Sequence, residues 1–183
     1  MIEFELKKII QFDIYKSIWC AFKWDEVNTQ INYYYDVFPF RKNNKMTIRI
    51  RSVNNVHKLQ IKNKYQNSNI ARIEFEEKVP YIFPSISSEK IKAVSGLHYD
   101  DVFLIGALVT QRYTHHWSDA ITICLDRNEY LGTIDYELEI EYDKAVTPDL
   151  LTILAEYGIK FDNEKQIGKY SRYMKRYYNM RAI

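Results

Sequence analysis

The chain has 183 residues, of which 46% are hydrophobic and 27% are charged, and its formal net charge is +2. This balance is typical of a folded globular protein, and it gives no reason to expect a nucleic acid or an anionic membrane as partner. Because no apolar run has transmembrane length and no signal peptide is recognised, we expect a cytoplasmic protein. Cys20 and Cys124 have no metal-type spacing and are expected to be small core residues.

Eight segments are expected to contain β-strands, and most of them alternate polar or charged residues on one face with apolar residues on the other. The first segment lies at the start of the chain, where Glu3, Glu5 and Lys7 share one face and Phe4 and Leu6 share the other. The other seven strands are expected at residues 29–36, 47–51, 58–62, 71–79, 103–115, 120–126 and 135–142. A turn is expected at Arg127-Asn128, after the seventh strand.

Four segments are expected to be helical. The first is capped by Asp13 and runs to about residue 22, and the second spans residues 85–94. The third begins at Thr147-Pro148 and ends at Gly158. The fourth is a basic and aromatic tail at about 163–181.

The charged faces of the strands carry one sign at a time. One strand has a row of carboxylates, and two others have rows of cations. The carboxylates are Glu137, Glu139 and Glu141, and the cations are Arg49, Arg51, Lys58 and Lys62. Any one of these charged rows, taken alone, could simply be a strand face exposed to solvent. If about eight strands close into a barrel, however, the charged faces converge inside it, where buried charges must be paired or bound to a ligand. Carboxylates beside arginines and lysines then suit a divalent cation that holds a polyanion such as polyphosphate.

The order of these motifs resembles a known family. Glu3-x-Glu5-x-Lys7 resembles the ExExK signature of the CYTH superfamily, the triphosphate tunnel metalloenzymes, which include inorganic triphosphatases, thiamine triphosphatases and CyaB-type class IV adenylate cyclases. Further segments similar to the family's motifs follow in its order: the aromatic-Asp segment 32–36, the RxR strand 48–51, the basic strand 59–62, Arg72-x-Glu74-x-Glu76, Leu125-Asp126, Leu131-Gly132, Glu137-x-Glu139 and Lys169-x-x-Arg172. The resemblance covers nearly the whole chain and is closest to the bacterial YjbK-like branch.

The resemblance implies an α+β fold with one domain over residues 1–183. Its core would be an eight-stranded antiparallel β-barrel, the triphosphate tunnel, with helices packed on the outside and a C-terminal basic helix at about 163–181. The resemblance also implies Mg²⁺ or Mn²⁺ as cofactor, with four carboxylate ligands: Glu3, Glu5, Glu137 and Glu139.

The resemblance further implies a set of phosphate-binding cations: Lys7, Arg49, Arg51, Lys62, Arg72, Arg112, Lys169 and Arg172. Glu76, Asp126 and Lys7 are implied as catalytic, the acids by orienting water or a second metal. The chain departs from the family at Thr110, where the family often has the lysine of a Lys-x-Arg pair. This departure leaves one cation fewer for the phosphates.

The function implied is that of a metal-dependent hydrolase of triphosphate compounds, with inorganic triphosphate first. The alternatives are a thiamine triphosphatase, a class IV-type adenylate cyclase, or a non-catalytic tunnel that binds polyphosphate or nucleotides. The partner expected is a small-molecule triphosphate rather than a nucleic acid or membrane, and a homodimer is left open. The motifs recognise phosphates and do not identify an attached organic group.

Overall fold

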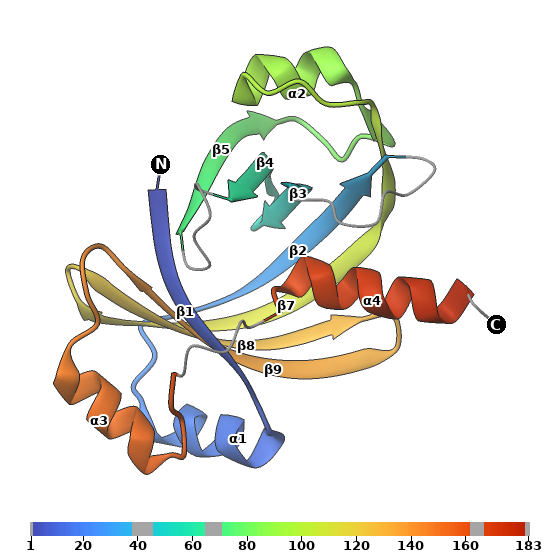
Figure 1. Cartoon of the computed structure of the whole chain (residues 1–183). Coiled ribbons are helices and arrows are strands. Elements are labelled where there is room, and N and C mark those ends of the chain that lie inside the picture. The colour runs from blue at the N-terminus through green and yellow to red at the C-terminus, as the bar shows by residue number, and fades with distance from the viewer. Residues whose placement is uncertain (1, 38–45, 65–70, 162–166, 182–183) are drawn as a thin grey trace. The chain divides into compact units, whose positions relative to one another are not determined.

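The computed structural model describes residues 2–37, 46–64, 71–161 and 167–181, which form nine strands and four helices (Figure 1). The chain divides into two compact units. Unit 1 consists of residues 1–2 and 30–109, and unit 2 of residues 3–29 and 110–183. In the described part of the chain, no helix combines the length and the apolar character needed to cross a bilayer.

Unit 1 is built on strands that pair antiparallel in chain order: β2 (Glu26–Asp36, which begins in unit 2), β3 (Met46–Val53), β4 (Val56–Lys64) and β5 (Ala71–Val79). A two-residue turn joins β3 to β4, and its residues Asn54 and Asn55 have φ values of 49° and 61°. Positive φ at both positions is the type I′ geometry that suits the twist of a hairpin, and asparagine tolerates it. The turn therefore sets the register of the β3–β4 pair.

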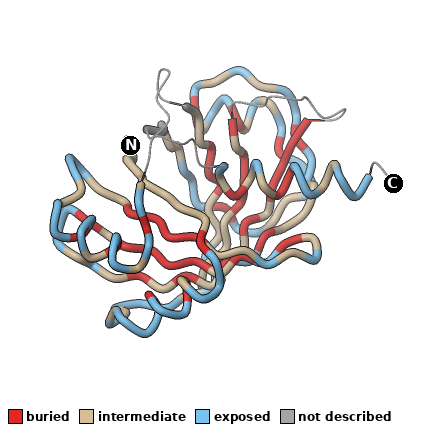
Figure 2. Tube along the Cα trace, turned by 60° about the horizontal axis from the view of Figure 1, so that its bottom comes forward, coloured by how far each residue is buried: buried red, intermediate tan, exposed pale blue. Residues whose placement is uncertain are grey.

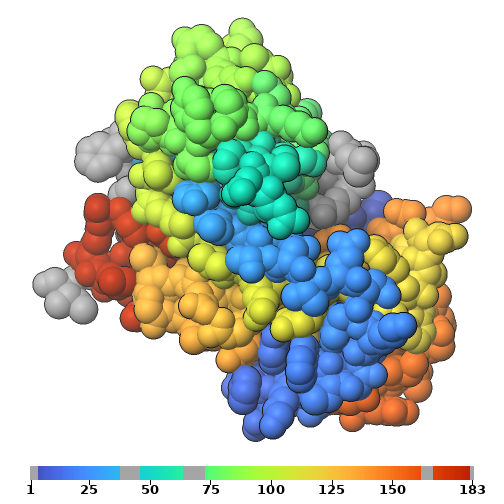
Figure 3. Space-filling view, turned by 180° about the vertical axis from the view of Figure 1, so that it is seen from behind, coloured from blue at the N-terminus to red at the C-terminus, as the bar shows by residue number. Residues whose placement is uncertain are grey.

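The apolar face of the unit 1 strands packs against helix α2 (Ser88–Ser95), which lies at the surface (Figure 3, green). Ile91 of this helix is fully buried, and Ser87 caps the helix by accepting a hydrogen bond from the backbone N–H of Lys90. The prediction of a helix over 85–94 is wrong at its start. Residues 85–86 instead form the short strand β6 (Ser85–Ile86), which pairs with the beginning of β7 (Val102–Ser118).

Unit 2 has three strands in antiparallel register: β1 (Ile2–Ile10), β9 (Thr133–Tyr142) and β8 (Ile121–Tyr130). The end of β7 lies beside β8. The predicted turn at Arg127-Asn128 is wrong, because both residues continue β8 and the turn follows at Leu131-Gly132. Asparagine is common in turns, which is why the sequence predicts a turn at Asn128. Its buried side chain instead donates a hydrogen bond to Asp135 on the paired strand β9.

One face of the unit 2 strands is apolar and is covered by helices α1 (Phe12–Ala21) and α3 (Pro148–Glu156). Ile18 and Leu154 of these helices are fully buried in the same core as the strand residues, which Figure 2 shows in red. Helix α1 begins one residue before the predicted cap, with Gln11 at the N-cap position. The predicted packing of helices on the apolar side of the sheet is therefore found for α1 and α3.

Helix α4 (Lys169–Arg181) lies on the opposite, charged face of the unit 2 strands, where its first turn contacts β9. The helix is shorter than predicted. Residues 167–168 precede it without being helical, and residues 163–166 of the predicted helix lie outside the described residues. Its position brings two cations onto a row of carboxylates.

Candidate functional site

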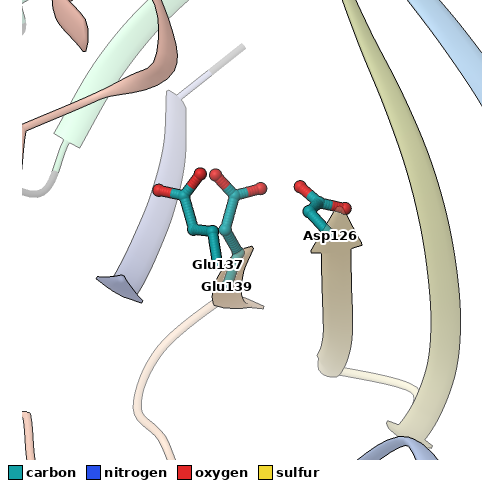
Figure 4. A group of neighbouring side chains, drawn as sticks. All are labelled: Asp126, Glu137 and Glu139. Atoms are coloured by element: carbon teal, nitrogen blue, oxygen red, sulfur yellow. The ribbon is translucent and has the colours of Figure 1, made fainter. Parts of the chain in front are cut away.

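Three buried carboxylates meet on the charged face of unit 2. Asp126 on β8 is directly opposite Glu137 on β9 in the strand register, and Glu139 is the next residue on the same face of β9. These residues, the carboxylate cluster, are 0%, 0% and 5% exposed, and one oxygen atom from each lies within 4.8 Å of the others. Figure 4 shows their carboxyl groups on one side of the two strands.

The ammonium group of Lys169 lies among the three carboxylates. Its Nζ atom is 2.8 Å from Asp126 Oδ2, 2.7 Å from Glu137 Oε2 and 2.8 Å from Glu139 Oε1. Burial by itself lowers the pKa of a lysine, but the three carboxylates outweigh burial and raise the pKa of Lys169 above its usual value. Lys169 is therefore charged at neutral pH.

Arg112 and Lys7 complete the contacts of the carboxylate cluster. Arg112 on β7 binds Asp126 in a bidentate pair, with Nε 2.8 Å from Oδ1 and Nη2 2.7 Å from Oδ2, and it also contacts Glu139. Lys7 Nζ lies 2.6 Å from Glu5 Oε1 and 3.6 Å from Glu139 Oε1. Burial opposes ionisation of Glu139, but Lys169, Arg112 and Lys7 outweigh it and hold the pKa of Glu139 well below its usual value.

A second network holds Arg172 beside the cluster. Arg172 Nε is 2.9 Å from Asp135 Oδ2, and Nη2 is 2.9 Å from Glu137 Oε2. Asp135 also accepts hydrogen bonds from Asn128 and from the hydroxyl group of Tyr130. At the position of the absent family lysine, the hydroxyl group of Thr110 donates to Asn128 Oδ1 at 2.7 Å. A neutral hydrogen bond thus occupies that position.

The charged face of unit 2 has more carboxylates than cations. Among the described residues that these contacts join, six acids face four cations: Glu5, Asp126, Asp135, Glu137, Glu139 and Glu141 against Lys7, Arg112, Lys169 and Arg172. A divalent cation would balance this excess of two negative charges. Carboxylate oxygens are also the donors that Mg²⁺ and Mn²⁺ prefer, so the residues fit a site for such an ion.

Unit 1 carries the opposite excess on the polar face of its strands, which we call the basic face. In the described part of β3–β5 the cations outnumber the acids: Arg49, Arg51, Lys58, Lys62 and Lys78 against Glu74 and Glu76. Lys62 Nζ is 2.9 Å from Glu74 Oε2, and Lys58 Nζ is 2.6 Å from Glu76 Oε1. The excess of cations suits an anion.

The structure groups most of the predicted site residues, within each unit. Unit 2 joins Glu5, Lys7, Arg112, Asp126, Glu137, Glu139, Lys169 and Arg172 by direct contacts. Unit 1 places Arg49, Arg51, Lys62 and Glu76 on one face. The side chains of Glu3 and Arg72 lie outside the described residues. The predicted site omits Asp135, Asn128 and Gln60, although the spacing of two along their strands is the signal that could have included them.

Cys124 lies on the charged face of β8, opposite Glu139. Cys124 is buried as predicted, whereas the expectation that Cys20 is a core residue is wrong because Cys20 is exposed on α1. Burial, outweighing the nearby Arg112, raises the pKa of the Cys124 thiol.

We therefore expect a thiol-specific disulfide reagent at pH 8 to modify Cys20 readily in the native protein and Cys124 only after denaturation. Peptide mapping of the modified protein checks this result, with Cys20→Ser as the control that should react in denaturant alone. Rapid native labelling of Cys124 would contradict the burial of this face.

Comparison with known proteins identifies the family. Residues 1–170 match the CYTH domain. No curated protein matches the sequence. A crystal structure of a candidate adenylate cyclase from Bacillus halodurans is similar, with 20% identity over 93% of this chain and 96% of that one, and a TM-score of 0.69.

Two further structures share the fold. The Hippeastrum protein HpAC1, named as a candidate adenylyl cyclase and described as having a dominant triphosphatase activity, has 18% identity over 95% of each chain and a TM-score of 0.68. The PH1819 protein of Pyrococcus horikoshii has 21% identity over 94% of this chain and 98% of that one, with a TM-score of 0.61. At these identities the structures support the fold, and the domain match covers most of the sequence. The chain belongs to the CYTH family.

Proposed function

We propose that this protein is a metal-dependent hydrolase of triphosphate compounds, with inorganic triphosphate as its main substrate. The observation that carries the proposal is the buried carboxylate cluster with its excess of negative charge, within a CYTH chain that also has a basic face. The carboxylate cluster suits a divalent cation, and the basic face suits a polyanion. The described triphosphatase activity of the Hippeastrum protein supports the same reaction class.

Asp126, Glu137 and Glu139 would hold the Mg²⁺ or Mn²⁺ ion in this proposal. Glu5 joins them, since Lys7 bridges it to Glu139, and Glu3 is kept as a fourth ligand from the sequence. Asp126, which the sequence motif placed among the catalytic acids, is assigned here as a metal ligand because it shares the cluster. Such an ion neutralises phosphoryl oxygens and lowers the pKa of bound water.

The phosphate groups are assigned to the cations. Arg49, Arg51 and Lys62 on the basic face, with Arg72 from the sequence motif, would bind the phosphoryl oxygens. Arg112, Lys169 and Arg172 would bind them on the charged face of unit 2.

Lys7 would stabilise the charge that develops on the leaving phosphate. Glu5 and Glu139 outweigh burial and raise its pKa, so Lys7 is a cation at neutral pH and not a general base. Glu76 is an ionised carboxylate whose pKa is lowered by the hydrogen bond from Lys58, and we assign it to orienting the attacking water.

Membership of the family supports two broader proposals. The strands would close into an eight-stranded barrel, the triphosphate tunnel, as one domain over residues 1–183. The partner would be a small-molecule triphosphate. A cytoplasmic location and a homodimer are kept as expectations.

The test is phosphate release from tripolyphosphate by metal-stripped protein with Mg²⁺ or Mn²⁺ added. ATP and thiamine triphosphate are run alongside, and the products are separated. We expect metal-dependent orthophosphate from tripolyphosphate. A cyclic nucleotide from ATP as the main product would instead support a cyclase, and an increase in Tm with tripolyphosphate but no turnover would support a binding tunnel; either outcome contradicts the proposal.

A further inference from the structure

Two buried hydrogen-bond donors on the basic face have no partner among the residues that the structure describes. They are Nδ2 of Asn32 on β2 and Nη2 of Arg49 on β3. Asn32 is 0% exposed and Arg49 is 7% exposed. Buried donors are nearly always paired in folded proteins, so two such atoms on adjacent strands indicate a ligand that supplies acceptors.

The strand register makes the two side chains neighbours. Asn32 lies opposite Arg51, and Tyr34 lies opposite Arg49, so Asn32 and Arg49 are diagonal neighbours on one face of the β2–β3 pair. Diagonal neighbours are about 7–8 Å apart at their backbones, which a long side chain such as arginine spans. The two free donor atoms can therefore reach one bound group.

The other atoms of both side chains are already held. Asn32 Oδ1 accepts a hydrogen bond of 3.0 Å from Arg51 Nε, which fixes the amide so that its NH₂ group is the free end. Arg49 Nε donates to Gln60 Oε1 at 2.9 Å, and Gln60 is in turn held by its hydrogen bond to Glu76. The orientation of both donors is thus set before any ligand arrives.

The chemistry of the pair selects an anion. Both atoms are donors, so the occupant must offer acceptors. Arg49 donates its Nε–H to a neutral amide, and its charge acts on Glu74 only as a secondary influence, since Lys62 does more than Arg49 to outweigh burial and lower the pKa of that carboxyl group. A phosphate group has both the charge and several acceptor oxygens that an arginine and an amide can share.

We propose that Asn32 and Arg49 form a preformed subsite for one phosphate group of the substrate, with Asn32 Nδ2 as a direct ligand, and that the subsite binds without a metal ion. The identity of the anion rests on the proposed function. Asn32 thereby has two tasks, because its oxygen positions Arg51 and its NH₂ group binds the phosphate. All of these groups belong to unit 1, whereas the carboxylate cluster belongs to unit 2.

The discriminating variant is Asn32→Asp, which keeps an oxygen for Arg51 and replaces the donor with a negatively charged acceptor. Binding of tripolyphosphate is measured by calorimetry in EDTA at fixed ionic strength, with inorganic phosphate and sulfate alongside. We expect binding to weaken at least about tenfold in the variant. Asn55→Asp, which makes the same change of charge at the exposed β3–β4 turn, should bind within about twofold of the wild type.

A purely structural role for Asn32 predicts the opposite result, because aspartate strengthens the contact with Arg51 and leaves binding intact or tighter. That outcome overturns the subsite, as does a wild-type protein that does not bind tripolyphosphate in EDTA. A wild-type protein that binds without hydrolysing any triphosphate contradicts the proposed function alone.

A second measurement uses the unaltered protein, in case the variant does not fold. In ¹⁵N-labelled wild type, the side-chain amide signals of Asn32 should shift on addition of tripolyphosphate in EDTA. Their exchange with solvent should also slow, since the NH₂ group becomes hydrogen-bonded. Asn55 serves as the exposed reference, and an Asn32 signal that moves no more than the Asn55 signal overturns the subsite.

Discussion

Replacement of Glu137 by glutamine is expected to abolish metal-dependent turnover while the protein stays folded. Glu137 is fully buried, and its side chain contacts both Lys169 and Arg172. Glutamine has the same shape but no charge, so the cluster loses one of the three carboxylates that are proposed to hold the metal ion. Substitution of a residue that only contacts a metal ligand typically weakens metal binding about 10- to 100-fold. We therefore expect loss of a ligand carboxylate to weaken Mn²⁺ binding at least about a hundredfold.

The measurements are calorimetric titration with Mn²⁺ and phosphate release from tripolyphosphate. Glu129→Gln is the matched control, because Glu129 lies on β8 with its side chain exposed and paired with Arg127. This control should bind Mn²⁺ and turn over as the wild type does. Unchanged Mn²⁺ affinity in Glu137→Gln would contradict the assignment of Glu137 as a metal ligand. If turnover were lost all the same, Glu137 would have another role in the reaction.

Lys169→Met should make the stability of the protein depend on a divalent cation. The ammonium group lies within 2.8 Å of all three carboxylates of the cluster. Replacement of Lys169 by methionine removes this positive charge and leaves the three buried carboxylates without it. Removing one partner from a buried ionic group typically costs about 3–5 kcal/mol, so we expect a loss of that size in the free energy of unfolding in EDTA. Mn²⁺ should then restore about 2.7 kcal/mol at a hundred times its Kd.

Urea unfolding in EDTA and in Mn²⁺ measures both quantities. Lys175→Met changes an exposed lysine of the same helix and should leave the stability within about 0.5 kcal/mol. A cation bound at the proposed site would take the place of Lys169 among the three carboxylates, so the variant should bind Mn²⁺ more tightly than the wild type does. The displaced ammonium would then be available to phosphate oxygens, which reconciles its position here with the phosphate-binding role that the sequence predicts. Wild-type stability of Lys169→Met in EDTA would contradict this account.

The strands and their charged faces could be predicted from the sequence because alternation has a period of two. The pairing of Glu137 with Glu139 on one face, and of Arg49 with Arg51 on another, follows from that period alone. The length of β8 could not be predicted, because Asn128 is a common turn residue. Asn128 is a strand residue here because it pairs opposite Asp135 on β9, and its side chain makes hydrogen bonds with Asp135 and Thr110 on the neighbouring strands.

The position of Lys169 also could not be predicted from the sequence. Its helical spacing with Arg172 indicates a basic helix face, which in isolation would be solvated. Packing of α4 onto the charged face places the ammonium group among three carboxylates, and this depends on contacts distant in the sequence. Likewise, the free NH₂ group of Asn32 follows from a hydrogen bond to Arg51, 19 residues away.

The hairpin of β8 and β9 has a consequence for the order of folding. Its two strands are joined by the two-residue turn Leu131-Gly132, and a hairpin with so short a loop closes in about 1–10 μs. Closing it sets Asp126 directly against Glu137, and like charges opposite one another oppose pairing. The compensating Lys169 lies 30 residues or more further along the chain from both Glu137 and Glu139. The hairpin therefore forms against its own repulsion until Arg112 on the preceding strand pairs with Asp126 and Lys169 on α4 pairs with Glu137.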